Sequence, residues 1–243
     1  MDDVETIRRY YEAILPYYDD SLADRGDLPF WEAAARRWTP ARILELGCGT
    51  GRVTAVLTRV APVVAVDLLV EMLAHAVRNA PRAQLVAADI RQFAFAESFD
   101  LIVLADDPMA HLISIDDRRR VMKLIADHLS PGGRVVIEGL YRQPGTAVAP
   151  NESWCPTDDP SVWNAHYRYE KNGAIVDVST VMRSWSRTEV DQLADAGLEV
   201  ENVWGDFDER PFADDAKRMI IVARRAVTSR TAAVARGSTA DRP

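Results

Sequence analysis

Short apolar runs alternate with amphipathic segments between residues 42 and 138. Apolar runs bounded by turn residues are typical of buried strands, and their alternation with helical patterns indicates β-α-β units around a parallel sheet covered on both faces. The sequence therefore predicts an α/β protein with a doubly wound, mostly parallel sheet. We expect strands at residues 42–46, 63–67, 84–88, 99–104 and 134–138, and helices at 52–60, 70–79 and 116–129.

The segments on either side of this core break the alternation. Residues 141–160 are rich in Pro, Asn, Asp and Gly and are predicted to form a loop. The Asn172-Gly173 pair separates two β-rich runs, at 163–170 and 174–183, and predicts a hairpin over the carboxyl ends of the sheet. We expect further helices at 4–18, 28–38 and 189–196 and further strands at 199–204 and 219–224. The predicted organisation is one domain at 1–225, with a helical lid at 1–39 and an insertion at 141–185, and a disordered tail at 226–243.

Bulk properties exclude several classes of function. The net charge of −8 and the lack of a basic stripe argue against a nucleic-acid partner. No apolar run has the length of a membrane span, and the first residues lack a secretory signal, so we expect no membrane partner and a cytoplasmic location. The two cysteines, Cys48 and Cys155, have neither disulfide nor metal-ligand spacing, so no metal is expected.

A glycine-rich turn connects the first apolar strand directly to a helix. Gly47, Gly49 and Gly51 occupy every second position, and glycine there lets backbone amides approach a ligand closely. The pattern differs from the dinucleotide fingerprint G-x-G-x-x-G, because the third glycine comes one residue early. The turn therefore favours a ligand other than a pyrophosphate.

Glu45-x-Gly47-x-Gly49-x-Gly51 after an apolar strand resembles motif I of class I S-adenosylmethionine-dependent methyltransferases. The resemblance spans about residues 43–138 and implies a Rossmann-like, seven-stranded fold that binds S-adenosylmethionine and releases S-adenosylhomocysteine. It implies that Asp67 binds the ribose hydroxyls and that Asp89 meets the adenine amino group. The other expected cofactor-binding residues are Tyr18, Arg25, Glu45, Gly47, Cys48, Gly49, Gly51, Leu68, Met72, Ile90, Ala105 and Asp106.

The acceptor site is expected beside the cofactor. His111 follows the fourth strand, where relatives admit the acceptor, and we predict that it acts as a base or a substrate ligand. Tyr17 in the helical lid is the second expected catalytic residue, whereas Tyr11 is assigned to packing. The expected substrate-binding residues are Tyr10, Asp107, Trp154 and Tyr167.

The placement of the lid, the histidine and the insertion is similar to small-molecule N-methyltransferases that act on amino sugars in antibiotic pathways. The acidic pair Asp106-Asp107 departs from those relatives, which tend to carry uncharged polar residues there. Methylation of an amine nitrogen in a small molecule is the preferred function. Two alternatives stay open: an O-methyltransferase acting on a hydroxyl or carboxyl group, and a regulatory protein that binds S-adenosylmethionine without catalysis. Oligomeric state is also open, a homo-oligomer included.

Overall fold

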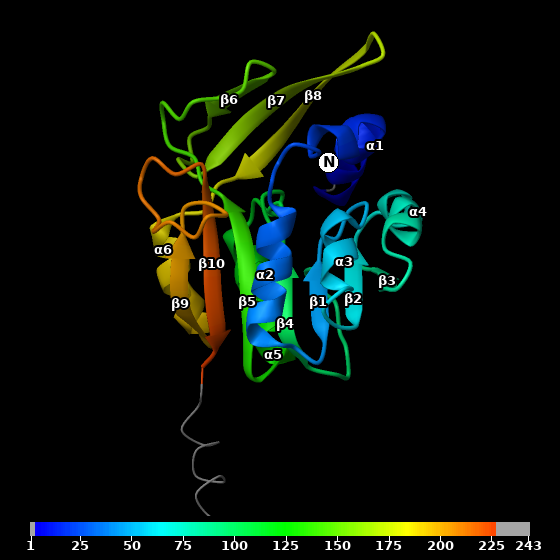
Figure 1. The fold of residues 1–243 in the computed structure, drawn as a ribbon. Coiled ribbons are helices and arrows are strands. Elements are labelled where there is room, and N and C mark those ends of the chain that lie inside the picture. Colours follow the sequence, from blue (N-terminus) through cyan, green and yellow to red (C-terminus); the bar gives the residue numbers. More distant parts are fainter. Residues whose placement is uncertain (1–2, 227–243) are drawn as a thin grey trace, which may run out of the picture.

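The computed structural model describes residues 3–226, and its centre is a seven-stranded sheet in the order β3-β2-β1-β4-β5-β10-β9 (Figure 1). Strands β1 to β5 pair in parallel, and β10 pairs antiparallel with both β5 and β9. The predicted doubly wound, mostly parallel sheet is confirmed. The strands are β1 (Ile43–Leu46), β2 (Val63–Asp67), β3 (Gln84–Ala87), β4 (Phe99–Leu104), β5 (Leu129–Leu140), β9 (Leu198–Trp204) and β10 (Arg218–Arg225).

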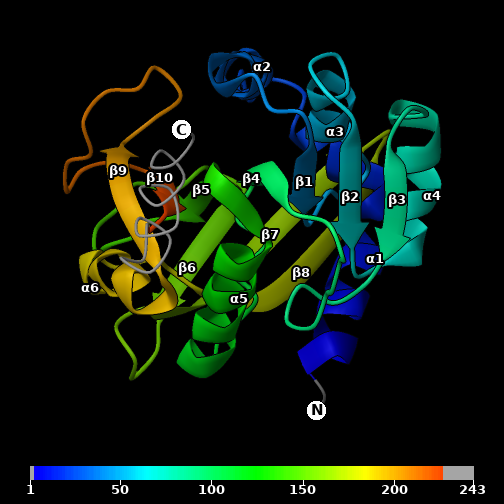
Figure 2. The ribbon, with the colours of Figure 1, turned by 90° about the horizontal axis from the view of Figure 1, so that it is seen from below.

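Helices cover both faces of this sheet (Figure 2). On one face α2 and α3 bury Trp31, Val53 and Leu57 against the central strands. On the other face α5 and α6 bury Val121, Ile125 and Val190. The sheet is therefore held between two apolar layers, and the carboxyl ends of its parallel strands stay free for a site. The helices are α1 (Asp3–Ser21), α2 (Leu28–Trp38), α3 (Arg52–Leu57), α4 (Val70–Asn79), α5 (Ile115–His128) and α6 (Arg187–Asp191), which is followed by a 3₁₀ turn at Gln192–Ala196.

A second, three-stranded antiparallel sheet stands over the carboxyl ends of the parallel strands (Figure 1). It consists of β6 (Glu152–Pro156), β7 (Val162–Lys171) and β8 (Ala174–Arg183). Helix α1 (Asp3–Ser21) packs on it through a small apolar core that includes Tyr10, Ile14, Ala165 and Met182. The insertion and α1 together roof the space above the main sheet.

Two expectations about local structure need correction. Residues 141–160 are not wholly a loop, because β6 pairs with β7 from Glu152 to Pro156. Strand β5 begins at Leu129 rather than at 134, because Leu129 pairs with Phe99 while the turn-like residues 130–133 form an irregularity in the ladder. Most of the predicted tail lies outside the described residues. Within residues 3–226, none of the helices has the length and apolarity to cross a membrane.

Candidate active site

The glycine turn lies between β1 and α3 and is pinned to β2. The amides of Gly47 and Cys48 donate to the Val66 carbonyl at 2.8 and 2.9 Å. Gly47 has φ 75°, and a Cβ built on it would lie 2.3 Å from Cβ of Pro108. The third predicted ligand, Gly51, has φ 83°, immediately precedes α3 and packs against Ala76. Position 47 requires glycine because Pro108 lies too close for a Cβ, whereas Gly51 shapes the turn at the start of α3.

Two carboxylates stand at the carboxyl ends of neighbouring strands: Asp67 is the last residue of β2, and Asp89 follows β3 by two residues. Asp67 accepts hydrogen bonds from the amides of Gly49 at 2.7 Å and Leu69 at 2.9 Å, and burial raises the pKa of this carboxyl despite those donors. Burial would also raise the pKa of Asp89, but the hydrogen bonds of Arg91 lower it below its ordinary value. Each carboxylate oxygen has a second lone pair, so Asp67 retains acceptor capacity for a ligand.

These groups line a cavity of about 710 Å³ above the glycine turn, which we call the glycine-loop cavity. It contains most of the predicted cofactor residues: Tyr18, Gly47, Gly49, Asp67, Leu68, Met72, Asp89, Ile90, Ala105 and Asp106. Sequence reasoning missed Ile7, Tyr11, Leu69, Arg91, Pro108 and Leu112, which also line it. These residues either flank the recognised motifs or lie on α1. For Tyr11 the sequence did hold a signal, because it lies seven residues before Tyr18 and so shares its face of the helix.

Glu45, in β1, and Cys48, in the turn, do not line this cavity. Both line a smaller pocket of about 280 Å³ that they share with Tyr18 and Arg52. The Glu45 carboxylate accepts a hydrogen bond from Thr54 Oγ1 at 2.5 Å, and burial raises its pKa to about 8. Glu45 is therefore mostly protonated at neutral pH, and its hydrogen bond with Thr54 connects β1 to α3 on either side of the turn.

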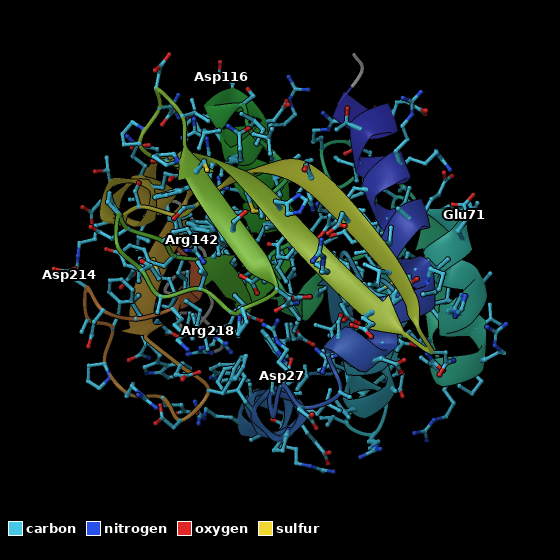
Figure 3. The ribbon with its side chains drawn as sticks, turned by 90° about the horizontal axis from the view of Figure 1, so that it is seen from above. Asp27, Glu71, Asp116, Arg142, Asp214 and Arg218 are labelled. Atoms are coloured by element: carbon cyan, nitrogen blue, oxygen red, sulfur yellow. The ribbon has the colours of Figure 1, made fainter. Side chains whose placement is uncertain are left out.

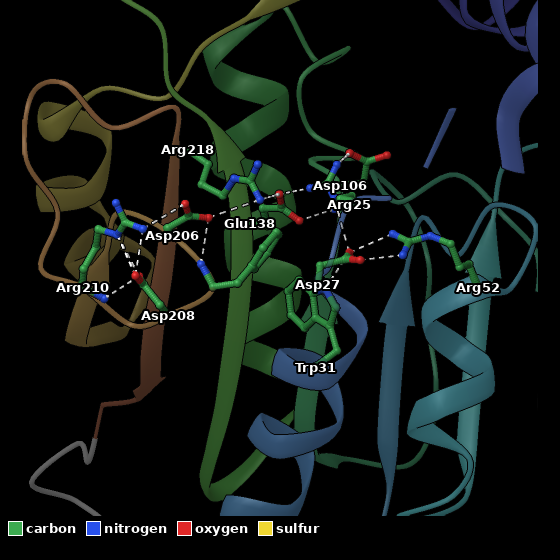
Figure 4. A network of polar contacts seen from close by, with 11 residues as sticks. Arg25, Asp27, Trp31, Arg52, Asp106, Glu138, Asp206, Asp208, Arg210 and Arg218 are labelled. Carbon is green, nitrogen blue, oxygen red and sulfur yellow. Dashed lines mark hydrogen bonds and ion pairs between the residues drawn. The ribbon is translucent and has the colours of Figure 1, made fainter. Parts of the chain in front are cut away.

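Arg25 occupies the centre of an ionic network instead of standing free for a ligand (Figure 4). Its guanidinium pairs with Asp106 and Glu138, and its Nε lies 3.3 Å from Asp27. Asp27 is itself bound bidentately by Arg52 at 2.6 and 2.8 Å. All three guanidinium nitrogens of Arg25 thus lie beside protein carboxylates. To bind a cofactor carboxylate, Arg25 would have to exchange one of these partners, so its role as a cofactor ligand stays a prediction.

A larger cavity of about 1590 Å³ opens between α1, the insertion and the ends of β5 and β10, and we call it the insertion cavity. Four residues line both cavities: Tyr11, Tyr18, Asp106 and His111. His111 is only 5% exposed, its Nε2 lies 3.1 Å from the Tyr11 hydroxyl, and burial lowers its pKa to about 4. An uncharged imidazole therefore lies where the two cavities meet.

Some of the residues predicted for the acceptor site line the insertion cavity, and Tyr17 does not. Tyr10, Trp154 and Tyr167 line the insertion cavity as expected. Tyr17 lines neither cavity and contacts Tyr169, with ring centroids 6.1 Å apart. Helix geometry explains its position: Tyr11 and Tyr18 are seven residues apart and share a face of α1, whereas Tyr17 is rotated from Tyr18 by about 100°.

Asp107, predicted to bind the substrate, lines the insertion cavity, but protein groups already occupy its carboxylate. Its carboxylate accepts hydrogen bonds from the Leu140 amide at 2.6 Å and from Trp185 Nε1 at 3.4 Å, and the residue is 7% exposed. Burial raises its pKa to about 6, against the opposing effect of Arg118. Asp107 therefore fastens the His111 loop to both ends of the insertion. Among the described residues, no cluster of His, Cys, Asp or Glu is arranged to hold a metal ion.

The family model and the curated relatives described here each match about two fifths of this chain. Residues 43–133 match the family described as a methyltransferase domain. A dTDP-4-amino-2,3,4,6-tetradeoxy-D-glucose N,N-dimethyltransferase from Saccharopolyspora spinosa is 37% identical over 100 residues, which are 40% of this chain and 39% of that protein. A trans-aconitate 2-methyltransferase from Azoarcus sp. is 37% identical over 101 residues, 40% of this chain and 38% of that protein. The chain thus spans about two fifths of these curated relatives.

Solved structures extend the similarity of fold over most of the chain. An amino pentose methyltransferase from Micromonospora echinaspora, described as bound to S-adenosylmethionine and involved in calicheamicin biosynthesis, superposes with a TM-score of 0.65. The identity is 22%, and the match covers 86% of this chain and 96% of that structure. Both chains therefore share one architecture.

Proposed function

We propose that the chain is a class I S-adenosylmethionine-dependent methyltransferase that transfers a methyl group to an amine nitrogen of a small molecule, because residues 43–133 match a methyltransferase domain and part of the chain is 37% identical to an N,N-dimethyltransferase. The amino-sugar N,N-dimethyltransferase among its relatives supports an amino sugar or a related secondary metabolite as acceptor. The observation that carries the proposal is the position of His111 and Tyr11, which line both cavities and lie 3.1 Å apart. Cytoplasmic residence stays a prediction from the sequence.

The glycine-loop cavity fits the cofactor on three grounds. A Cβ at Gly47 would collide with Pro108, so the turn keeps its backbone close to the cavity floor. Asp67 is nearly buried yet lines the cavity, and it retains lone pairs that suit ribose hydroxyls. Asp89 and Ile90 lie further along the wall, where they would flank an adenine. Bound S-adenosylmethionine supplies an electrophilic methyl group on a sulfonium.

The residues at the junction of the cavities suit a neutral amine. Displacement at a methyl carbon needs an aligned nucleophile and little water, and an amine attacks only through a free lone pair. His111 stays uncharged down to about pH 4, so it does not repel or protonate the acceptor. Its imidazole and the Tyr11 hydroxyl can hydrogen-bond to the amine and orient it, and Asp106 can attract the positive charge that the product nitrogen gains.

A screen of amines and alcohols with labelled S-adenosylmethionine tests the proposal, with products identified by mass. We expect a methylated amine from the wild type and a large loss of turnover in His111→Ala. His166→Ala is the matched control, because His166 lies on the exposed side of β7 and contacts Ser179. Full turnover by His111→Ala on the true acceptor would reject the assignment of His111.

O-methylation is the second candidate. It is supported by the relative named for trans-aconitate, a compound that has carboxyl groups and no amine. Base treatment before the mass assay separates carboxyl methylation from N-methylation, because a methyl ester is cleaved by mild base and a methylated amine is not. A product that loses its label in mild base would replace N-methylation by esterification.

A further inference from the structure

Arg142 lines the insertion cavity without an anionic partner. Its backbone amide donates to Ser184 Oγ at 2.9 Å, which fixes the residue just after β5. Its guanidinium carbon lies 4.2 Å from the centre of the Trp154 ring, in a cation-π contact. Its Nε is buried without a hydrogen-bond partner, and its side chain forms no ion pair within residues 3–226. Viewed from above, Arg142 lies on the β10 side of the insertion, as Arg218 does (Figure 3).

The surroundings of Arg142 hold the guanidinium in place but do not neutralise it. Burial lowers the pKa of Arg142 although the nearby Glu152 acts in the opposite direction. The Glu152 carboxylate accepts a hydrogen bond from Trp154 Nε1 at 3.0 Å instead of pairing with the arginine. Stacking on Trp154 restricts the plane of the guanidinium, whose outer nitrogens then form a preorganised fork for an oxyanion.

A second cation, Lys217, lines the same cavity. Antiparallel pairing places Arg218 of β10 opposite Leu140 of β5. Lys217, just before β10, and Arg142, just after β5, therefore lie at the same end of this strand pair. Both residues line the insertion cavity, and Lys217 forms no ion pair among the described residues. Arg218 differs from them because Asp206 and Glu138 lie 3.5 and 3.9 Å from it.

We propose that Arg142, with Lys217 beside it, forms an anion-binding subsite, and that the methyl acceptor carries a phosphate or carboxylate group as well as its amine. This inference rests on the proposed N-methylation, because it places the two ends of the acceptor in one cavity. The amine meets His111 and Asp106 at the inner end, and the oxyanion meets the fork of Arg142 at the mouth. An acceptor with both groups would be recognised at two points and held in one orientation.

Calorimetric binding of three matched hexoses tests the subsite without methyl transfer. Glucose 1-phosphate and glucuronate carry the two oxyanions, and glucose is the neutral reference. We expect the purified wild type to bind at least one of the charged sugars more tightly than glucose, and the stronger of the two identifies the anion. In Arg142→Gln that advantage should fall about tenfold or disappear, since a bidentate charge-assisted contact is lost.

Two further variants keep the test decisive. Arg168→Gln is the matched control, because Arg168 lies on the exposed side of β7 and pairs with Asp177 at 2.9 Å, so it should bind like the wild type. Arg142→Lys keeps the charge on Trp154 but not the fork, and we expect affinity between those of wild type and Arg142→Gln. Equal binding of all three sugars by the wild type, or undiminished binding by folded Arg142→Lys and Arg142→Gln, would overturn the subsite. Charged-sugar binding that depends on Arg142 without methylation of any amine would overturn the proposed function alone.

Discussion

The Tyr11 hydroxyl lies 3.1 Å from Nε2 of His111, and this contact joins the N-terminal helix to the loop that follows β4. Their rings lie 5.3 Å apart in an edge-on arrangement, and Tyr11 also contacts Tyr18. Helix α1 thus brings an aromatic face down onto the boundary of the two cavities. The helix therefore contributes directly to the site as well as covering it.

Tyr11→Phe should reduce kcat about fivefold while leaving the fold intact. The substitution keeps the ring packing and removes one hydrogen bond worth about 1 kcal/mol, so His111 loses the contact that orients it. Steady-state kinetics on the identified acceptor measures the effect. Tyr17→Phe is the control, because Tyr17 lines neither cavity. Equal losses in both variants would show that the Tyr11 hydroxyl has no particular role.

His111 should make the protein less stable in mild acid. Burial lowers its pKa to about 4 in the folded state, so between about pH 6.5 and 4 the unfolded chain binds the extra proton and stability falls as pH falls. The contribution is at most about 3 kcal/mol across this window. Denaturant unfolding of wild type and His111→Gln at several pH values isolates it. The variant should lose less stability on acidification, and parallel curves would refute the buried, neutral imidazole.

The fold was predictable because its signals are local. Alternating apolar runs and helical spacing gave the order of β1 to β5 and α3 to α5, and Asn172-Gly173 gave the hairpin. Strand β6 was missed because Glu152 to Pro156 are few, largely exposed and end in a proline, and only pairing with β7 makes them a strand. Such pairing is a tertiary effect that a sequence pattern does not contain.

The residues predicted to bind the cofactor mostly line one cavity, whereas those predicted to bind the acceptor are more scattered. Gly47, Gly49, Asp67 and Asp89 follow strand ends, so topology alone brings them together. The acceptor side is built from α1, β6, β7 and the end of β10, whose mutual approach has no sequence signature. Arg142 was therefore overlooked, and Arg25 was assigned to a ligand although three carboxylates surround it.

Gly47→Ala should destabilise the protein and obstruct the glycine-loop cavity. The residue has φ 75°, which costs a non-glycine residue about 1–2 kcal/mol, and its new Cβ would lie 2.3 Å from Pro108. Gly145→Ala separates the two causes, because Gly145 has φ 86° and open space around it. Thermal unfolding should therefore show a larger loss for Gly47→Ala than for Gly145→Ala. Comparable losses would mean that the approach to Pro108 is not tight.

Asp67→Asn should weaken the binding of S-adenosylhomocysteine by about 1–3 kcal/mol if the carboxylate holds the ribose hydroxyls. Isothermal calorimetry measures this without turnover. Asp100→Asn is the control, since Asp100 also accepts two hydrogen bonds, from Ala41 N and Ser130 Oγ, but at the opposite end of the strands. Unchanged affinity in Asp67→Asn would reject the ribose contact.

Asp107→Asn should change the pH dependence of stability in the direction opposite to His111. Burial raises the pKa of Asp107 to about 6, above its ordinary value near 3.8, so between these limits the folded chain binds the extra proton. Stability conferred by this group is therefore present in acid and declines as pH rises, by at most about 3 kcal/mol. Asparagine is neutral throughout and can still accept a hydrogen bond from Leu140 N or Trp185 Nε1. The variant should accordingly gain stability relative to wild type as pH rises from 4 to about 6, and unfolding curves that stay a constant distance apart would show that Asp107 titrates normally in its buried position.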